Sequence, residues 1–325
     1  MSKSPFEKVK REVLVKKESE TDSELGSEPD KRAVPELIDY GIINIDKPEG
    51  PTSHEVSAFV QDILKINKSG HSGTLDPNVT GVLPIALGRA TRIVQTLLKA
   101  GKEYVCIMHV HGDVKEDRLK KVIGGFVGKI KQLPPLKSAV KRVERIREVY
   151  YIDILEIDGK DVLFKVGCEA GTYIRKLCDD IGKKLGCGAH MASLRRTKAG
   201  PFDEDSLVTL HDLKDAYWYW KNENNEKYLR HCIQPMEAAV SHLPKIWVFD
   251  STVDSLCHGS DLKIPGVSRL ENIEKDQLVA VMTLKNELVA VGRAELVYNK
   301  ILGKDKGIAV RINKVFMKPG TYKRP

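Results

Sequence analysis

The chain has 325 residues, of which 41% are apolar and 30% are charged, and this length and composition suit a globular protein of two domains. Because 53 Lys and Arg oppose 45 Asp and Glu, the formal charge is +8, which allows a nucleic-acid partner without requiring one. No stretch approaches the ~18 uninterrupted apolar residues of a membrane-spanning helix, which argues against a membrane protein.

The cysteines and the first residues indicate a compartment. None of the six cysteines forms a C-x-x-C pair, and most lie in apolar or strand-like segments, as is typical of buried thiols in a reducing environment. The first residues lack the apolar region of a signal peptide, so we expect a cytoplasmic protein. Cys187-Gly-Ala-His190 is similar to half of a zinc site, but no second half has ligand spacing, and we predict no metal.

Residues 1–35 are a polar extension whose first half is basic and whose second half is acidic. Without a long apolar period, such a segment is either disordered or an arm packed on another part of the chain. The short apolar run at 13–15 is suited to add one strand to a neighbouring sheet.

Strands and helices follow from residue 41 onward. Residues 41–45 predict a short strand, after which Thr52 and Ser53 cap a helix. The i, i+3, i+4, i+7, i+8 spacing predicts the buried face of this helix as Val56, Phe59, Val60, Ile63 and Leu64. The next predicted elements are a loop at 67–81, a strand at 82–87, a helix at 89–99 and a strand at 104–111.

The middle of the chain predicts a hairpin followed by a helix. Strands at 149–157 and 162–168 are joined by turn residues at 158–161. A helix at 172–185 follows, and its predicted buried stripe is Ile174, Leu177, Cys178, Ile181 and Leu185. This irregular alternation favours a mixed sheet with helices packed against it, which is an α+β fold.

The composition changes between residues 217 and 245, where an aromatic run gives way to polar residues and prolines. We therefore predict an N-terminal extension at 1–35, a larger domain at 36–243 and a C-terminal domain at 244–325. The last domain contains short predicted strands and a tight hairpin link at 284–288, and we expect a small β-barrel. Its strands are predicted at 246–249, 277–284, 288–294 and 308–316.

One loop combines the residue types that chemistry needs. In Gly70-His71-Ser72-Gly73-Thr74-Leu75-Asp76-Pro77 the glycines allow close backbone approach and Pro77 stiffens the exit. A carboxylate on such a braced loop is well placed for catalysis. The alternative is a structural turn, because Asp before Pro commonly accepts hydrogen bonds from its own backbone.

The surrounding motifs decide between these readings. The loop is followed by Gly81-x-Leu83-Pro84 and Gly88-x-Ala90-Thr91, and it is preceded by Asn44-x-Asp46-Lys47-Pro48. Lys102-x-Tyr104, Gly171-Thr-Tyr-Ile-Arg175 and Leu194-Arg195-Arg196 come later, in order. This ordered series resembles the TruB and dyskerin family of pseudouridine synthases, and the resemblance implies the mixed-sheet catalytic domain of that family.

The resemblance also implies a role for each matching position. Asp76 falls where the family has its essential aspartate, and Tyr104 falls where a ring stacks on the flipped uracil. Tyr173 and Arg175 match residues that hold the carboxylate and substrate. The remaining substrate-binding candidates are His71 near the displaced nucleotide, Leu194 in the base pocket and Lys47 beneath the active site. The reaction breaks the N1–C1′ bond and rejoins the uracil through C5, so it requires no cofactor.

Two further regions are suited to RNA. Residues 129–147 contain seven Lys or Arg and one Glu, a net of +6 (seven minus one), which fits either a solvated face or a track for phosphates. The RNA-binding candidates there are Lys129, Lys131, Lys137, Lys141, Arg142, Arg145 and Arg147. Residues 247–318 resemble the PUA domain, an RNA-binding module, through segments such as Ile264-Pro265-Gly266 and Gly307-Ile308-Ala309.

Within the family, the short segment after Leu133-Pro-Pro and the N-terminal extension resemble the archaeal, dyskerin-like branch. That resemblance implies two kinds of partner. One is an H/ACA guide RNA with small accessory proteins that select uridines in rRNA, and the other is tRNA, modified at its T-loop uridine. The contrasting hypothesis is a non-catalytic RNA-binding scaffold. A base-exchange transglycosylase is disfavoured, because the eight regular βα units of its barrel are absent.

Overall fold

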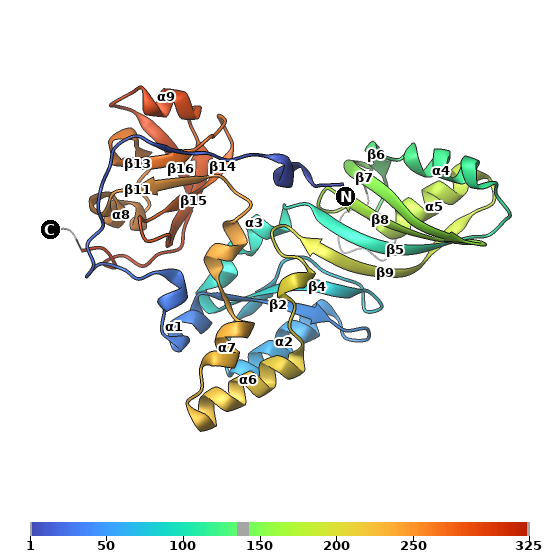
Figure 1. Cartoon of the computed structure of the whole chain (residues 1–325), viewed down its shortest axis with the longest axis horizontal. Coiled ribbons are helices and arrows are strands. Elements are labelled where there is room, and N and C mark those ends of the chain that lie inside the picture. The colour runs from blue at the N-terminus through green and yellow to red at the C-terminus, as the bar shows by residue number, and fades with distance from the viewer. Residues whose placement is uncertain (1, 135–142, 324–325) are drawn as a thin grey trace.

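The computed structural model describes residues 2–134 and 143–323, and within them the strands form two mixed sheets (Figure 1). A nine-stranded sheet belongs to the catalytic domain and a seven-stranded sheet to the C-terminal domain. Each sheet is mostly antiparallel with one parallel pair. The predicted α+β fold with a β-rich C-terminal domain is therefore confirmed.

The nine-stranded sheet has the order β10-β2-β4-β9-β5-β8-β7-β6, and β3 pairs with β4 beside this path. Its centre is the parallel contact between β4 and β9, which joins two antiparallel halves. Its strands are β2 (Gly41–Lys47), β3 (Ser69–His71), β4 (Thr80–Leu87), β5 (Lys102–Val110), β6 (Gly128–Gln132), β7 (Arg145–Asp158), β8 (Asp161–Cys168), β9 (Ala189–Ala199) and β10 (Gln234–Pro235).

Helices pack on each half of this sheet. In Figure 1, α4 and α5 lie against the β5–β8 half, while α2, α6 and α7 lie below β2 and β4. The helices are α1 (Val34–Asp39), α2 (Ser53–Leu64), α3 (Val94–Leu98), α4 (Glu116–Gly124), α5 (Ile174–Leu185), α6 (Leu210–Glu223) and α7 (Lys227–Cys232). Short 3₁₀ segments are η1 (Pro5–Lys8), η2 (Pro29–Lys31), η3 (Gly88–Ile93), η4 (Glu204–Ser206) and η5 (Met236–Val240).

The seven-stranded sheet has the order β1-β13-β11-β14-β15-β16-β12. The hairpin link predicted at 284–288 joins β14 and β15. The elements are β11 (Lys245–Val248), α8 (Asp250–Cys257), β12 (Leu262–Lys263), η6 (Ile264–Gly266), β13 (Val267–Glu271), β14 (Leu278–Met282), β15 (Leu288–Ala294), α9 (Tyr298–Leu302) and β16 (Ile308–Val315).

The N-terminal extension is an arm packed on the rest of the chain. Its apolar run forms β1 (Val13–Val15), which pairs antiparallel with β13, as the sequence predicts. Other parts of the arm contact the catalytic domain, where the Ser2 hydroxyl donates to Asp153 at 2.8 Å. The arm therefore connects both domains.

The predicted helices are partly right. All five residues of the α5 stripe are buried. In α2, however, Phe59 is 44% exposed, because the helix buries only a narrower stripe through Val56, Val60 and Leu64. The predicted helix at 89–99 begins as η3 and becomes α-helical only at Val94. Sequence reasoning missed α4, in which only Leu119 and Ile123 are buried.

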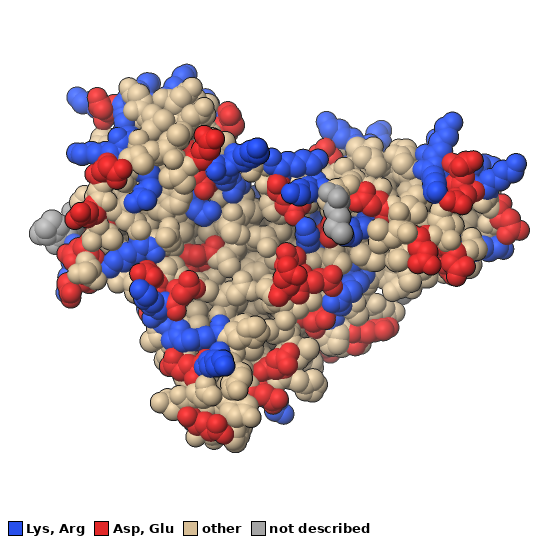
Figure 2. Space-filling view, in the orientation of Figure 1, with Lys and Arg blue, Asp and Glu red and all other residues tan. Residues whose placement is uncertain are grey.

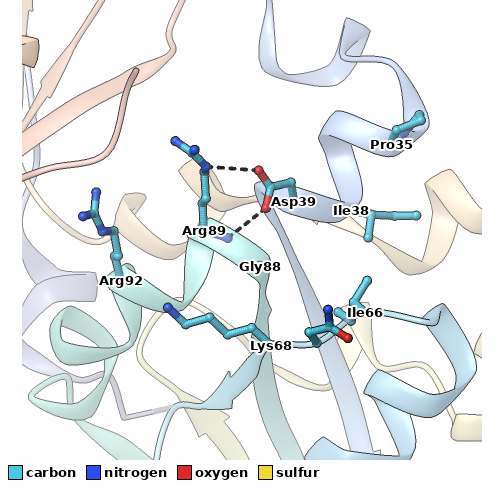
Figure 3. Close-up of a pocket in the computed structure, with 9 residues that line it drawn as sticks. Pro35, Ile38, Asp39, Ile66, Lys68, Gly88, Arg89 and Arg92 are labelled. Carbon is cyan, nitrogen blue, oxygen red and sulfur yellow. Dashed lines mark hydrogen bonds and ion pairs between the residues drawn. The ribbon is translucent and has the colours of Figure 1, made fainter. Parts of the chain in front are cut away.

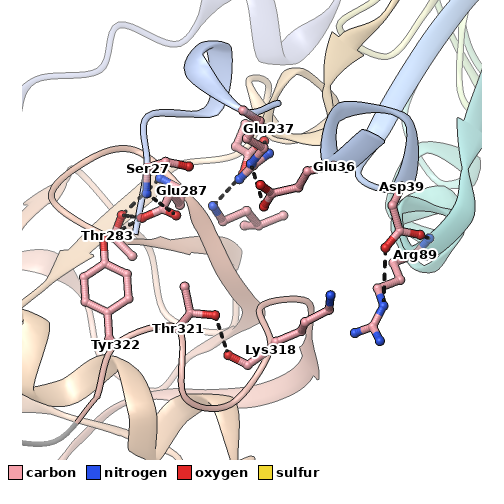
Figure 4. Close-up of polar contacts among 12 residues, drawn as sticks. Ser27, Glu36, Asp39, Arg89, Glu237, Thr283, Glu287, Lys318, Thr321 and Tyr322 are labelled. Atoms are coloured by element: carbon pink, nitrogen blue, oxygen red, sulfur yellow. Dashed lines mark hydrogen bonds and ion pairs between the residues drawn. The ribbon is translucent and has the colours of Figure 1, made fainter. Parts of the chain in front are cut away.

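The two domains share a buried core. Tyr40 and Ile42 of the catalytic domain pack in one cluster with Trp247, Met282 and Leu288. Polar contacts reinforce this junction (Figure 4). Arg32 donates to both oxygens of Glu237 at 2.9 and 2.8 Å, and Glu237 also accepts from the backbone of Leu288 at 2.9 Å. The relative position of the domains is thus fixed by buried contacts.

A second carboxylate at the junction joins three parts of the chain. Glu287 accepts hydrogen bonds from the backbone of Ser27 in the arm at 3.1 Å and from the hydroxyl of Tyr322 at 2.5 Å (Figure 4). Thr283 donates to the same side chain at 3.1 Å.

Within the described residues, no helix has the length and apolarity that crossing a lipid bilayer demands.

Candidate active site

The loop that contains Asp76 leaves the edge strand β3 and returns into β4. Its backbone is pinned at the start by Ser72, whose N–H donates to Pro84 at 3.0 Å. Gly73 has a φ of 135°, in the region that favours glycine. Leu75 is buried at 4% exposure and fixes the turn to the core, whereas the next residue, Asp76, has a side chain that is 56% exposed. The loop therefore presents its carboxylate to solvent from a buried anchor.

Two side chains hold this loop from below. The Ser53 hydroxyl, in the first turn of α2, accepts from the N–H of Leu75 at 2.8 Å and donates to its carbonyl at 3.2 Å. The ammonium of Lys47 is fully buried and donates to the carbonyls of Pro48, Pro77 and Val79 at 2.9 to 3.0 Å. Burial lowers the pKa of Lys47, although Asp76 and Glu49 oppose the change. Lys47 thus fixes the backbone that follows Asp76.

Asp76 and Arg175 meet directly, although they are far apart in the sequence. Arg175 Nη2 donates to Asp76 Oδ2 at 2.6 Å. The two side chains are 59% and 56% exposed, so water competes for the pair and it contributes little to stability. The resemblance implies that Arg175 holds the carboxylate, and this contact agrees with that expectation.

The start of α5 positions Arg175. Tyr173 is the N-cap residue, and the Gln132 side chain both accepts from its N–H at 3.0 Å and donates to its carbonyl at 3.1 Å. Gln132 is 2% exposed and lies at the end of β6. A buried amide therefore fixes the residue that comes two positions before Arg175.

A buried arginine supports both the loop and the expected stacking ring. Arg196 is 1% exposed, and its Nε donates to Val82 at 2.7 Å, while its terminal nitrogens donate to Gly73 at 3.4 and 3.3 Å. Its positive charge also acts on the phenol of Tyr104, whose pKa it lowers against the larger effect of burial. Burial raises the pKa of the Tyr104 phenol and lowers the pKa of Arg196. The hydrogen bonds of Arg196 join β9 to β4 and to the loop that contains Asp76.

Leu194 and His71 complete the predicted group. Leu194 is 8% exposed and packs in the same core as Leu75 and Tyr104. His71 lies at the end of β3, with its ring 4.9 Å from that of His54 in an edge arrangement. Burial and the neighbouring His54 and Arg196 lower the pKa of His71, which favours the neutral imidazole.

The basic segment is only partly described. Lys137, Lys141 and Arg142 lie outside the described residues. The other four candidates lie on the β6–β7 hairpin, whose register places Lys129 and Lys131 on one face and Arg145 and Arg147 on the other. The second face also contains Gln132, which contacts Tyr173. Arg147 is paired with Glu169 at 3.4 Å and bonds to the Gly171 carbonyl at 3.3 Å, so it already has protein partners.

The fold brings together histidines that are separate in the sequence. His111 and His190 share a hydrogen bond of 2.8 Å, and His109 contacts Asp161 at 2.7 Å. Among the residues that the structure describes, no group of three or more His, Cys, Asp or Glu side chains is arranged to hold a metal ion.

The arrangement presents one carboxylate, that of Asp76, in a position fixed by Arg175. A solvent-facing carboxylate beside a guanidinium can act as a nucleophile or base on a group that enters from outside. Sequence reasoning missed Ser53 and Gln132 as supports. It named Arg196 only as part of a motif, although strand alternation places Arg196 on the same face as Leu194.

Family models match almost the whole chain. "TruB family pseudouridylate synthase (N terminal domain)" matches residues 61–117 and 109–174, and "tRNA pseudouridylate synthase B C-terminal domain" matches 175–241. A "PUA domain" matches 244–316, and a "DKCLD (NUC011) domain" matches 2–57.

Whole-chain relatives agree with these models. The chain is 60% identical to the probable tRNA pseudouridine synthase B of Thermococcus kodakarensis and 57% identical to that of Methanopyrus kandleri, over 97% and 98% of this chain and 94% of each relative. Among solved structures, a chain from "a Cbf5-Nop10-Gar1 Complex" is similar with a TM-score of 0.93 and 56% identity, covering 98% of this chain and 97% of that one. Another, from an "H/ACA RNP bound to a substrate RNA containing 2'-deoxyuridine", has a TM-score of 0.92 and 53% identity, with 99% of each chain covered.

Proposed function

The chain belongs to the TruB family of pseudouridine synthases, and from this premise we propose that Asp76 is the carboxylate with which it isomerises uridine in RNA. The observation that supports this most is the contact between Asp76 and Arg175 on the solvent face of an anchored loop. The guanidinium holds the carboxylate in place, and a carboxylate held in this way can attack carbon or accept a proton.

The reaction exchanges one bond for another within one nucleotide. The N1–C1′ bond breaks, the uracil turns and C5 bonds to C1′, after which the C5 proton is lost and N1 gains one, so nothing is oxidised or reduced. Asp76 can act by attacking C1′ or C6, or by removing a ribose proton, and its position is compatible with each route. Arg175 holds the carboxylate in place during these steps.

The other candidates form the pocket for the extruded base. A uridine within folded RNA has to leave its stack before it reaches Asp76, and an aromatic ring recovers part of the lost stacking. We assign that ring to Tyr104, which Arg196 supports, and assign the apolar wall to Leu194. Tyr173 helps to hold the carboxylate and the substrate. His71 lies near the displaced nucleotide, and Lys47 supports the loop.

We further propose the RNA classes and partners. The names of the relatives support tRNA, at its T-loop uridine, as one substrate. The similarity to chains from H/ACA complexes supports a second use, in which a guide RNA and small accessory proteins such as those named there direct the enzyme to uridines in rRNA. The basic candidates of the β6–β7 hairpin and the PUA domain contact RNA in this proposal.

The cytoplasm is the proposed location of this activity. All six cysteines are free thiols, including Cys106 and Cys178, whose sulfur atoms are 3.7 Å apart without a disulfide. Free thiols at this separation fit a reducing compartment.

The decisive measurement is pseudouridine formation by purified protein on unmodified tRNA and on an rRNA fragment, with and without guide RNA and accessory proteins. We expect Asp76→Asn to lower the rate by roughly 1000-fold or more, because the isosteric amide can neither attack carbon nor accept a proton. Asp179→Asn is the matched control, since Asp179 is an exposed, ion-paired aspartate on α5. Product formation by Asp76→Asn at the rate of this control would refute the assignment.

The alternative is a scaffold that binds RNA without modifying it. It predicts that the wild-type protein binds these RNAs and forms no pseudouridine under any of the four conditions. The same assay therefore separates the two functions.

A further inference from the structure

A groove lies on the catalytic domain at the opposite end of β3 from the loop that contains Asp76. It is formed by α1, by the turn at residues 66–68 and by η3, and it has a volume of about 610 Å³. Figure 3 shows its lining, with Lys68 extending along the floor toward Arg92. The lining residues are Pro35, Ile38, Asp39, Ile66, Asn67, Lys68, Gly88, Arg89 and Arg92.

The lining is basic, and two of its cations have no acidic partner. Lys68, Arg89 and Arg92 oppose a single acid, Asp39, so the lining has a net charge of +2 (three minus one). Asp39 is already engaged by Arg89, at 3.5 Å from the guanidinium and 3.1 Å from the backbone N–H. Among the described residues, no carboxylate forms an ion pair with Lys68 or Arg92. Both remain available to an anion from outside.

The groove is built on a rigid frame. Gly88 has a φ of 47°, and a Cβ at this position would lie 2.3 Å from Asp39 Oδ1, so only glycine fits. The Gly88 N–H donates to the Lys68 carbonyl at 2.9 Å, which joins the 66–68 turn to η3. The backbones from which the two cations extend are therefore fixed relative to one another, and little ordering of the protein accompanies binding.

The groove also lies beside the C-terminal domain and leads to the active site. Arg92 Nη1 donates to the carbonyl of Val315 at the end of β16, at 3.3 Å. On the other side, β3 begins at Ser69, directly after Lys68, and ends at His71, which is three residues and therefore about 10 Å from Lys68 at 3.3 Å per residue. A polymer that contacts both the PUA domain and Asp76 can pass over this groove.

We propose that the groove binds the phosphodiester backbone of RNA, with Lys68 and Arg92 each contacting a phosphate. This inference rests on the proposed function, because it identifies where the RNA runs outside the base pocket. Charges of both signs are mixed over the face in Figure 2, so the overall surface charge does not indicate where the RNA runs. The indication comes instead from Lys68 and Arg92, the two cations of the groove without an acidic partner among the described residues. Phosphate contacts of this kind fix register without reading sequence.

The test is the salt dependence of RNA binding. Each phosphate contact contributes about 0.9 to the slope of log K against log salt for a duplex and about 0.7 for a single strand. Lys68→Gln with Arg92→Gln should lower the magnitude of the slope by ~1.8 if the groove binds a duplex and by ~1.4 if it binds a single strand. The slope is measured with an unmodified tRNA transcript and with an H/ACA guide RNA hairpin. Lys68→Gln alone should lower it by about half as much, and this single variant leaves the Arg92 contact with Val315 in place.

The control is Lys121→Gln with Lys184→Gln, which removes the same charge from exposed lysines of α4 and α5, at the far end of the molecule from α1 in Figure 1. A slope that falls equally in this control, or that stays unchanged in both groove variants with both RNAs, overturns the proposal. Pseudouridine formation by the wild-type protein is measured separately. Its absence would refute the proposed function without changing the slopes.

Discussion

The ion pair of the candidate active site and the basic groups beneath it differ in their exposure to solvent. Asp76 and Arg175 are more than half exposed and contact each other directly. Lys47 and Arg196 are buried, and their hydrogen bonds go to backbone carbonyls. The exposed charges are free to meet RNA, while the buried ones fix the chain that carries them.

This contrast indicates where each kind of substitution acts. Exposed ion pairs contribute about 0–1 kcal/mol to folding, so changes there affect chemistry more than stability. Removing a buried donor leaves carbonyls without partners, at about 1–3 kcal/mol for each one. Variants in the buried layer should therefore change stability and activity together.

The largest expected effect on stability belongs to Arg196→Met. The substitution leaves the carbonyls of Val82 and Gly73 without this donor, and we expect a loss of about 2–4 kcal/mol in the free energy of unfolding. Because the loop before Asp76 then shifts, kcat should fall by roughly 100-fold even in folded protein. Denaturant unfolding and single-turnover rates measure the two effects. Unchanged kcat in folded protein would show that Arg196 only stabilises the fold.

The fold could be predicted from sequence where burial follows a simple period. The α5 stripe at i, i+3, i+4, i+7 was expected and is buried throughout, since the whole face lies against one sheet. The α2 stripe failed at Phe59, because periodicity cannot tell how wide a face its neighbours cover. Polar α4 gave too weak a period to be predicted.

The candidate site was predicted less by local pattern than by family resemblance. Asp76 and Arg175 are 99 residues apart, and nothing in the spacing of either motif indicates their contact. The resemblance brought them together, but it did not indicate that Ser53 and Gln132 hold the backbone on either side. Such supports use common polar residues whose role depends on tertiary contacts alone.

A pH-dependent effect is expected at His242, another largely buried basic group. Burial lowers the pKa of His242 to about 4, and the positive charges of Arg11, Lys102 and Lys245 act in the same direction. Below its ordinary value of 6.5, the unfolded chain binds a proton before the folded chain does. The contribution of neutral His242 to the free energy of unfolding is therefore fully present above pH 6.5 and is lost as the pH falls toward 4.

The size of this loss follows from linkage. Between pH 7.5 and pH 5 it should amount to about 2 kcal/mol, and His242→Gln should remove it. Urea unfolding of both proteins across this range measures the difference. Parallel pH curves for the two proteins would show that His242 titrates alike in the folded and unfolded states.

A somewhat smaller effect, on the order of 1–2 kcal/mol, is expected for Ser53→Ala. The substitution leaves the N–H and carbonyl of Leu75 without their partner, although Leu75 keeps its packing in the core. Ser57→Ala in the same helix is the control, since its hydroxyl contacts Ser69 and not the loop. The two variants should differ in kcat more than in melting temperature. Equal kcat values would show that Ser53 does not help to position the loop that contains Asp76.

The smallest expected effect on stability belongs to Arg175→Gln. Because both members of the pair are exposed, their separation should change the free energy of unfolding by less than about 0.5 kcal/mol. The rate of pseudouridine formation should nevertheless fall, since the carboxylate loses the group that orients it. Arg175→Lys should recover part of the rate, because an ammonium keeps the charge but lacks the planar geometry of the guanidinium. A destabilisation of Arg175→Gln as large as that of Arg196→Met would mean that the exposed pair supports the fold as the buried groups do.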